Sequence, residues 1–143
     1  MCKTHQEIIN IKSLTKKFDE KIIIDNLSLN IYKGEAITLI GQSGTGKTTL
    51  LKIISGIYNF DDGEIHLFGI DLKKATREEH RWINSKTGFL FQNYALFDSM
   101  NILENIIFYL IYHKKLNYEE SKNRAEFLLS IVGLENISTK YPS

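Results

Sequence analysis

The chain has 143 residues, of which 43% are hydrophobic and 24% are charged, and its formal net charge is +1. This composition is ordinary for a globular protein and excludes collagen-like, disordered and mucin-like classes. The near-zero charge gives no field that favours nucleic acid or anionic lipid as a partner. Cys2 is the only cysteine, so an internal disulfide is excluded.

Nothing in the sequence predicts a segment that spans a membrane. The longest uninterrupted apolar stretch, 106–112, has only seven residues, whereas a spanning helix needs about 20. Residues 1–10 include charged side chains and lack the apolar region of a signal peptide. We therefore expect a cytoplasmic protein, which does not exclude docking on a membrane protein.

Three segments near the start of the chain have the patterns of strands. Residues 8–18 alternate loosely, and residues 22–31 predict a second strand with an irregular middle at 25–26. A turn follows at 32–35. Residues 36–40 form a short apolar run between two glycines, which is typical of a strand buried on both faces.

The next part of the chain alternates between helical and strand patterns. A glycine-rich segment, 41–46, leads into residues 47–56, where apolar side chains recur at helical spacing and Gly56 fits a C-cap. Residues 64–68 alternate as a strand, and residues 87–91 form another short apolar strand.

The hydrophobic period changes in the last third of the chain. Residues 102–111 place their apolar side chains on one face of a helix, and residues 117–133 predict a second helix that ends at a glycine. Strands mixed with a helix, followed by helices alone, predict an α/β nucleotide-binding core over 1–100 and a helical subdomain over 101–143.

Residues 41–48 match the phosphate-binding pattern G-x-x-x-x-G-K-[ST]. Its glycines let the backbone turn tightly and bring N–H groups against phosphate oxygens, while the following helix directs its positive end at the same anion. The Lys47 ammonium reaches the β- and γ-phosphates, and the Thr48 hydroxyl is a hard ligand for the Mg²⁺ that accompanies ATP. The residues predicted to bind nucleotide here are Gly41, Gln42, Ser43, Gly44, Thr45, Gly46, Lys47, Thr48 and Thr49.

The pattern alone leaves the class of protein open. One alternative to nucleotide binding is a glycine-rich turn that binds no ligand. Against it, the predicted strand before the loop and the helix after it are the context that the motif requires. GTPases, kinases and ATPases all use such a loop. The N-K-x-D tetrapeptide that a GTPase normally shows is absent from the sequence.

The residues around the loop resemble an ABC-type ATPase. Segments 14–18 and 24–29 resemble the opening strands of the family, and 55–65 resembles the stretch after the phosphate-binding helix, with Phe60 where family members usually have proline. The resemblance implies a P-loop fold with an antiparallel β subdomain and a helical subdomain. It also implies that Phe18 stacks on adenine.

A second group of residues narrows the resemblance. Residues 88–92 resemble the Q-loop of the family, which implies that Gln92 ligates Mg²⁺ and senses the γ-phosphate. Segments 95–99 and 102–106 resemble the ATPase subunit of the Mla/Mce-type lipid transporters. In the family the segment after the Q-loop meets the transmembrane permease, so a permease is the implied partner of the residues after Gln92.

The last residues, 141–143, resemble the stretch that leads into the signature motif of the family. The resemblance therefore implies the N-terminal part of an ABC ATPase domain, truncated before the signature. The Walker B aspartate, the catalytic glutamate and the switch histidine would lie beyond Ser143, so no catalytic residue is predicted in this chain. We expect nucleotide binding without significant ATP turnover, a second ATPase subunit in the full-length form, and an unpaired apolar edge at 36–40.

The predicted function is that of the ATP-binding subunit of an ABC transporter that moves phospholipids, peripheral on the inner face of the inner membrane. Three alternatives stay open: a non-transport ABC ATPase of translation or repair, a transporter of nucleotide-type cargo, and a non-functional gene remnant. Co-purification with ribosomes or DNA, rather than with a permease, would favour the first of these.

Overall fold

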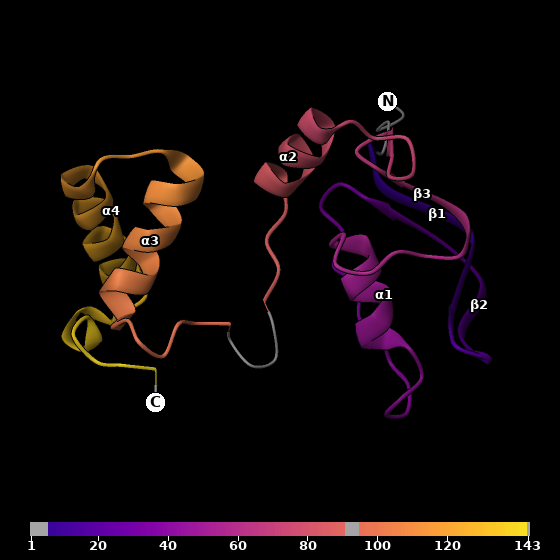
Figure 1. The fold of residues 1–143 in the computed structure, drawn as a ribbon, viewed down its shortest axis with the longest axis horizontal. Helices are drawn as coiled ribbons and strands as arrows, with labels where there is room; N and C mark the ends of the chain where they lie inside the picture. Colours follow the sequence, from indigo (N-terminus) through magenta and orange to yellow (C-terminus); the bar gives the residue numbers. More distant parts are fainter. Residues whose placement is uncertain (1–5, 91–94, 143) are drawn as a thin grey trace. The chain divides into compact units, whose positions relative to one another are not determined.

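The computed structural model of the chain describes residues 6–90 and 95–142. These residues belong to two compact units, which we describe separately: unit 1, Met1–Phe89, and unit 2, Leu90–Ser143 (Figure 1). Of the elements in the described residues, unit 1 contains the four strands and two helices, and unit 2 contains only helices. The described part of the chain has no helix that combines the length and the hydropathy needed to cross a bilayer.

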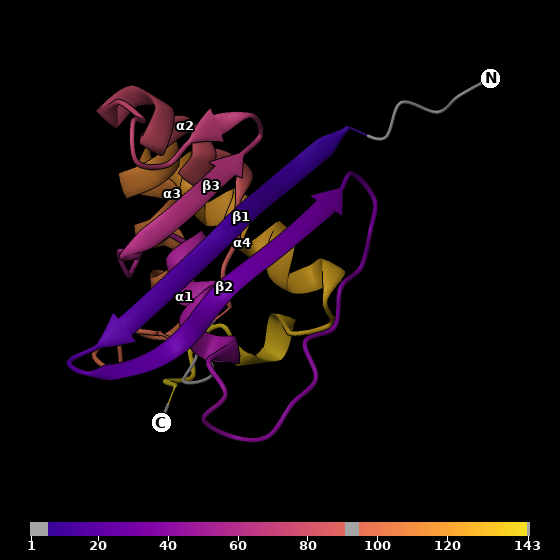
Figure 2. The same ribbon diagram turned by 90° about the vertical axis from the view of Figure 1, so that its right-hand side faces the viewer.

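Unit 1 is built on one antiparallel sheet. Its strands are β1 (Glu7–Phe18), β2 (Lys21–Tyr32), β3 (Asp62–Leu67) and β4 (Ile70–Asp71). Their order across the sheet is β2-β1-β3-β4, so the long strand β1 pairs with neighbours on both edges (Figure 2). The antiparallel β subdomain expected from the sequence is therefore present.

The pairing of β1 with β2 is irregular near its middle. The register shifts on either side of the Leu14↔Leu27 pair. Asn26 has a φ of +48°, a left-handed conformation that asparagine tolerates better than most residues. The irregularity predicted at 25–26 is confirmed.

Helix α1 (Lys47–Ile54) packs on one face of this sheet and closes the core of unit 1 (Figure 2). Helix α2 (Arg77–Lys86) adds one buried side chain and begins at a capping box in which Thr76 and Glu79 bond reciprocally. The buried core residues of unit 1 are Ile11, Leu14, Ile24, Leu50, Ile53, Ile65, Leu67 and Ile83.

Two predicted strands do not form. Residues 36–40 and 87–90 lie outside every strand of the sheet, and Phe91, the last residue of the second predicted strand, lies outside the described residues. In the first segment Leu39 packs against the core, but Ile40 is 92% exposed. The apolar pattern of 36–40 is that of a strand with neighbours on both sides, and no described strand lies beside it. Without a partner for its backbone groups, the run does not form a strand.

Unit 2 is a pair of helices joined by a short loop. Helix α3 (Ile102–Lys114) packs against α4 (Tyr118–Ile131) through a small core of Ile107, Leu110 and Ala125. The 3₁₀ helix η1 (Glu135–Ile137) follows α4. The helices predicted from the change of period are confirmed, each within a few residues of its predicted bounds.

One buried asparagine holds the segment before α3 onto the helix. The side chain of Asn105, 9% exposed, accepts from the backbone N–H of Phe97 at 2.8 Å. Its amide nitrogen donates to the carbonyls of Phe97, Met100 and Asn101 at 3.0–3.1 Å. These bonds fix a turn that has no regular secondary structure of its own.

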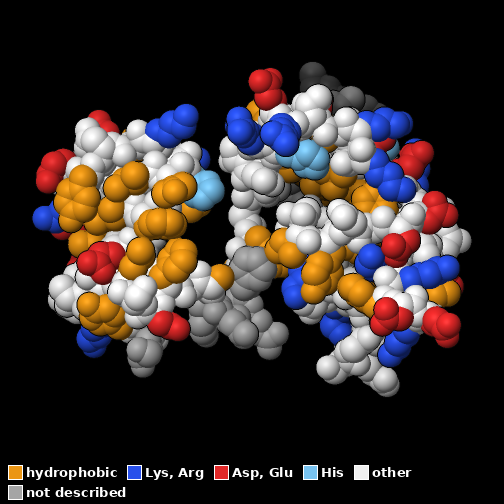
Figure 3. Space-filling view, in the orientation of Figure 1, with side chains coloured by type: hydrophobic (Ala, Val, Ile, Leu, Met, Phe, Trp, Pro, Cys, Tyr) orange, Lys and Arg blue, Asp and Glu red, His pale blue; other side chains and the backbone are white. Residues whose placement is uncertain are grey.

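Hydrophobic side chains also reach the surface of each unit (orange in Figure 3). In unit 2 they include Tyr109, Ile111 and Tyr112, on faces of α3 that do not enter its core. The apolar run 106–112 is therefore divided between the core and the surface of unit 2.

Candidate functional site

The glycine-rich loop at 41–46 leads directly into the N-terminus of α1. Gly44 and Gly46 have φ values of +82° and +91°, which L side chains rarely adopt. Gly46 is the N-cap of the helix and has no side chain to cap it. The first-turn N–H groups of α1 therefore face the loop with the positive end of the helix dipole.

Gly46 is also required by a close approach. A Cβ at this position would lie 2.9 Å from the carbonyl oxygen of Ile23 and 3.1 Å from its Cγ2. Ile23 belongs to β2, so the loop is pressed against the sheet at this point. A Cβ at Gly44 would meet nothing within 4 Å.

The loop winds around the ammonium of Lys47. This group donates to the carbonyl oxygens of Gly41 at 2.8 Å and Gln42 at 2.6 Å, and lies 3.3 Å from Thr45 Oγ1. The Thr45 hydroxyl donates to the same Gln42 carbonyl at 2.9 Å. A cation is thus fixed inside a loop of backbone carbonyls, beside the positive end of α1.

A pocket of about 270 Å³ opens beside this loop. It joins an aromatic and an aliphatic side chain from the sheet to hydroxyls and an ammonium from the loop and α1. The residues that line it are Phe18, Ile23, Ser43, Gly44, Gly46, Lys47, Thr48 and Thr49. Segments far apart in the sequence therefore meet at one site.

Most of the predicted site residues come together here. The structure brings Phe18 to the pocket, while Gly41, Gln42 and Thr45 surround the Lys47 ammonium. Gln92 lies outside the described residues. Ile23 also lines the pocket but was not predicted. The alternation of its strand indicates apolar neighbours and gives no signal that this side chain lines a pocket.

Phe18 is the last residue of β1, and its ring is 42% exposed. Tyr58 meets it edge to face, with ring centroids 5.6 Å apart. The Lys16 ammonium lies 5.1 Å from the centroid of the Phe18 ring. An accessible aromatic ring in a pocket that the Lys47 ammonium also lines is suited to a ligand that has both a planar group and an anionic group.

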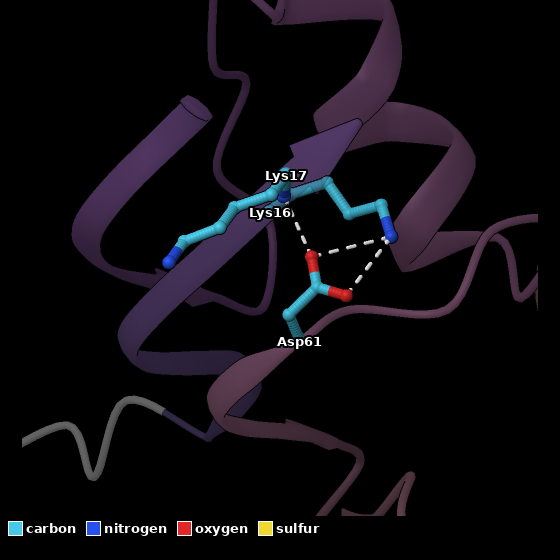
Figure 4. Close-up of polar contacts among 3 residues, drawn as sticks. All are labelled: Lys16, Lys17 and Asp61. Carbon is cyan, nitrogen blue, oxygen red and sulfur yellow. Dashed lines mark hydrogen bonds and ion pairs between the residues drawn. The ribbon is translucent and has the colours of Figure 1, made fainter. Parts of the chain in front are cut away.

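The Asp61 carboxylate beside this strand end bonds to Lys16 and Lys17 (Figure 4), and its pKa is lowered. The backbone N–H of Lys17 donates to Asp61 at 2.6 Å, and this bond is the main cause of the lowered pKa. The Lys16 ammonium, 3.3 Å from both carboxylate oxygens, lowers the pKa further. Asp61 is therefore an anion at neutral pH and does not line the pocket itself.

The residues present fit a polyphosphate and a divalent cation. The ammonium, the helix N-terminus and the backbone of the glycine loop are the donors that bind phosphate oxygens. The Thr48 hydroxyl is an oxygen ligand of the kind that Mg²⁺ prefers. No carboxylate stands among the described lining residues, so the site attracts rather than repels an anion.

Comparisons with known proteins agree with this geometry. The ABC transporter family matches residues 24–143. The chain is 42% identical to the spermidine/putrescine import ATP-binding protein PotA of Marinobacter nauticus over 96% of its length, and covers 35% of that protein. It is 36% identical to the methionine import ATP-binding protein MetN of Clostridium tetani over 94% of its length, and covers 42% of that protein. The chain thus spans about two fifths of the curated relatives that it matches.

A solved structure has the same fold. The dimeric structure of a bacterial ABC transporter cassette superposes with a TM-score of 0.83 at 31% identity, covering 94% of this chain and 62% of that one. The P-loop ATPase fold implied by the sequence is confirmed. The relatives are named for polyamine and methionine import, so they do not support the narrower resemblance to Mla/Mce-type lipid transporters. The chain belongs to the ABC transporter family, as part of its ATP-binding domain.

Proposed function

We propose that the chain binds ATP with Mg²⁺ as part of the ATP-binding subunit of an ABC importer. The observation that carries the proposal is the Lys47 ammonium, held in the glycine loop at the start of α1 and open to a pocket that Phe18 also lines. Cation, helix terminus and aromatic ring match the phosphates and the base of one nucleotide.

The phosphate end of the nucleotide is assigned to the loop. The backbone N–H groups around Gly44 and Gly46 and the dipole of α1 attract the phosphate oxygens. In the structure the Lys47 ammonium donates to neutral backbone carbonyls. Hydrogen bonds to a charged acceptor are roughly twice as strong, so a phosphate competes well for this ammonium.

The remaining contacts are assigned by chemistry. The Thr48 hydroxyl would hold Mg²⁺, together with Gln92 as the family resemblance implies, and the ion would neutralise charge on the phosphates. Phe18 stacks on the base, a contact that contributes about 1–3 kcal/mol in proteins that stack bases on aromatic rings. Ser43 and Thr49 line the same pocket and supply further hydroxyl donors.

The partners follow from the relatives. These are named as import ATP-binding proteins, so we assign the subunit to the inner face of the membrane, coupled to a permease through the segment after Gln92. Small polar or charged solutes are the cargo class that the relatives support. The related cassette forms a dimer, and a second ATP-binding subunit is assigned on that basis. The division into a nucleotide-binding core, 1–100, and a helical subdomain, 101–143, stays a prediction.

The binding of a fluorescent ATP analogue tests the proposal. Lys47→Ala and Lys47→Met remove the ammonium, and the second variant keeps most of the aliphatic stem. We expect an affinity loss of at least about 30-fold, since truncating a charged partner of a bound anion costs about 2–5 kcal/mol. Lys74→Ala, at an exposed lysine beside Asp71, is the matched control. Unchanged affinity in both Lys47 variants would overturn the assignment.

A further inference from the structure

The end of β1 is clamped by the loop that follows α1. Asp61 makes two backbone-directed bonds there: its own N–H donates to the carbonyl of Thr15 at 3.0 Å, and its carboxylate accepts from the N–H of Lys17 at 2.6 Å. Its carboxylate also pairs with the Lys16 ammonium at 3.3 Å (Figure 4). One carboxylate therefore fixes both the backbone and a side chain immediately before Phe18.

The same loop reaches the Phe18 ring directly. Tyr58, three residues before Asp61, contacts the ring edge to face, with centroids 5.6 Å apart. The Lys16 side chain is only 11% exposed, and its ammonium contacts both its ion-pair partner Asp61 at 3.3 Å and the Phe18 ring, 5.1 Å from the ring centroid. The Phe18 ring is thus restrained by two contacts, one with Tyr58 and one with Lys16.

Phe18 needs such restraint because of its position. It is the final residue of β1, and the next residue, Asp19, begins the turn with a φ of +52°. A side chain at a strand end has few neighbours to hold it, and ordering it only on binding lowers affinity. A ring that is already fixed in the pocket stacks on a base without that loss.

We propose that Asp61 is a positioning residue for recognition of the nucleotide base, acting through Lys16 and Lys17 on Phe18. The inference rests on the proposed function, in which Phe18 stacks on the base. The described bonds of Asp61 run to Thr15, Lys16 and Lys17, immediately before Phe18, so it acts on the base contact and not on the phosphates. Its lowered pKa keeps the carboxylate charged at neutral pH.

The test compares ATP with inorganic tripolyphosphate, which has the phosphates and no base. Asp61→Ala should weaken ATP binding about 3-fold, within the range of about 1.4- to 5-fold measured for exposed ion pairs, and leave tripolyphosphate binding unchanged within about 1.5-fold. Asp61→Asn and Lys16→Met are second variants that keep the side-chain volume. They should shift ATP binding in the same direction by about 2-fold.

Asp71→Asn is the matched control. This aspartate also accepts from a backbone N–H and pairs with a lysine, at 2.9 Å and 3.1 Å, but at the β4 turn away from the pocket lining. Its substitution should change the affinity for neither ligand. Urea unfolding of each variant confirms that it is folded at the assay temperature.

A double-mutant cycle completes the test. Phe18→Ala should weaken ATP binding about 5- to 150-fold, and adding Asp61→Ala to it should cause no further loss. Equal weakening of both ligands by Asp61→Ala, or independent losses in the cycle, would overturn the positioning role. If the unaltered protein binds neither ligand, the proposed function itself fails. If it binds both while the Asp61 variants do not differ from it, only this inference is lost.

Discussion

Two glycines of the phosphate-binding loop offer a sharp test of its packing. Gly44 and Gly46 have similar positive φ values, +82° and +91°, so replacing either by alanine introduces a similar backbone strain of about 1–2 kcal/mol. Only at Gly46 does the new Cβ meet another group, the Ile23 carbonyl oxygen at 2.9 Å. Because that oxygen is part of the β2 backbone, it does not move aside easily.

The backbone strain cancels when the two variants are compared. The forced contact adds about 1–3 kcal/mol to the loss of stability in Gly46→Ala alone. With a urea slope of about 1–3 kcal/mol per M, the unfolding midpoint of Gly46→Ala should fall about 1 M below that of Gly44→Ala. Circular dichroism through the urea transition measures both midpoints. Equal midpoints would refute the close approach of the loop to β2.

Three further predictions concern polar side chains inside each unit, one in unit 1 and two in unit 2. The carboxylate of Glu79 accepts from the N–H and hydroxyl of Thr76, which lowers its pKa below the ordinary 4.5. Its contribution is therefore present above that pH and lost as the pH falls through the lowered pKa, so the stability gap between the wild type and Glu79→Gln should close in acid. Asn105→Ala leaves the bonded backbone groups around Phe97 without partners and should lower the free energy of unfolding of unit 2 by about 1–3 kcal/mol, measured in urea. The hydroxyl of Ser121 is fully buried and has no hydrogen-bond partner among the described residues. Ser121→Ala should therefore leave the melting temperature unchanged or raise it, and a marked fall would contradict this reasoning.

The features that the sequence predicts well are those encoded by neighbouring residues. The glycine loop, its lysine and the helix after it all lie within 41–56, and the structure has them as expected. The N-caps of helices α3 and α4 are Asn101 and Asn117, each of which forms a capping box with a glutamate three residues later. Such signals act locally, so they do not depend on the rest of the fold.

The features that were predicted wrongly or not predicted at all depend on residues that are distant in the sequence. Residues 36–40 have the composition of a buried strand, but a strand needs neighbours, and composition does not show which neighbours are present. The clamp at Phe18 joins β1 to Asp61, more than 40 residues later. No periodicity marks that aspartate as different from Asp62 beside it, and only the fold brings it to the end of the strand.

The two strands that pair with β1 lie at very different distances from it in the sequence. β2 pairs from Phe18 and Lys21 onward, across a tight turn, whereas β3 pairs Ile9 with Leu67. Closing the longer loop costs more entropy and contributes to slower folding, while a hairpin forms in about 1–10 μs. A growing chain therefore contains Phe18 before it contains Asp61, the residue that clamps the end of β1. The restraint on Phe18 can therefore form only after residues 61–67 have been synthesised and β3 has paired with β1.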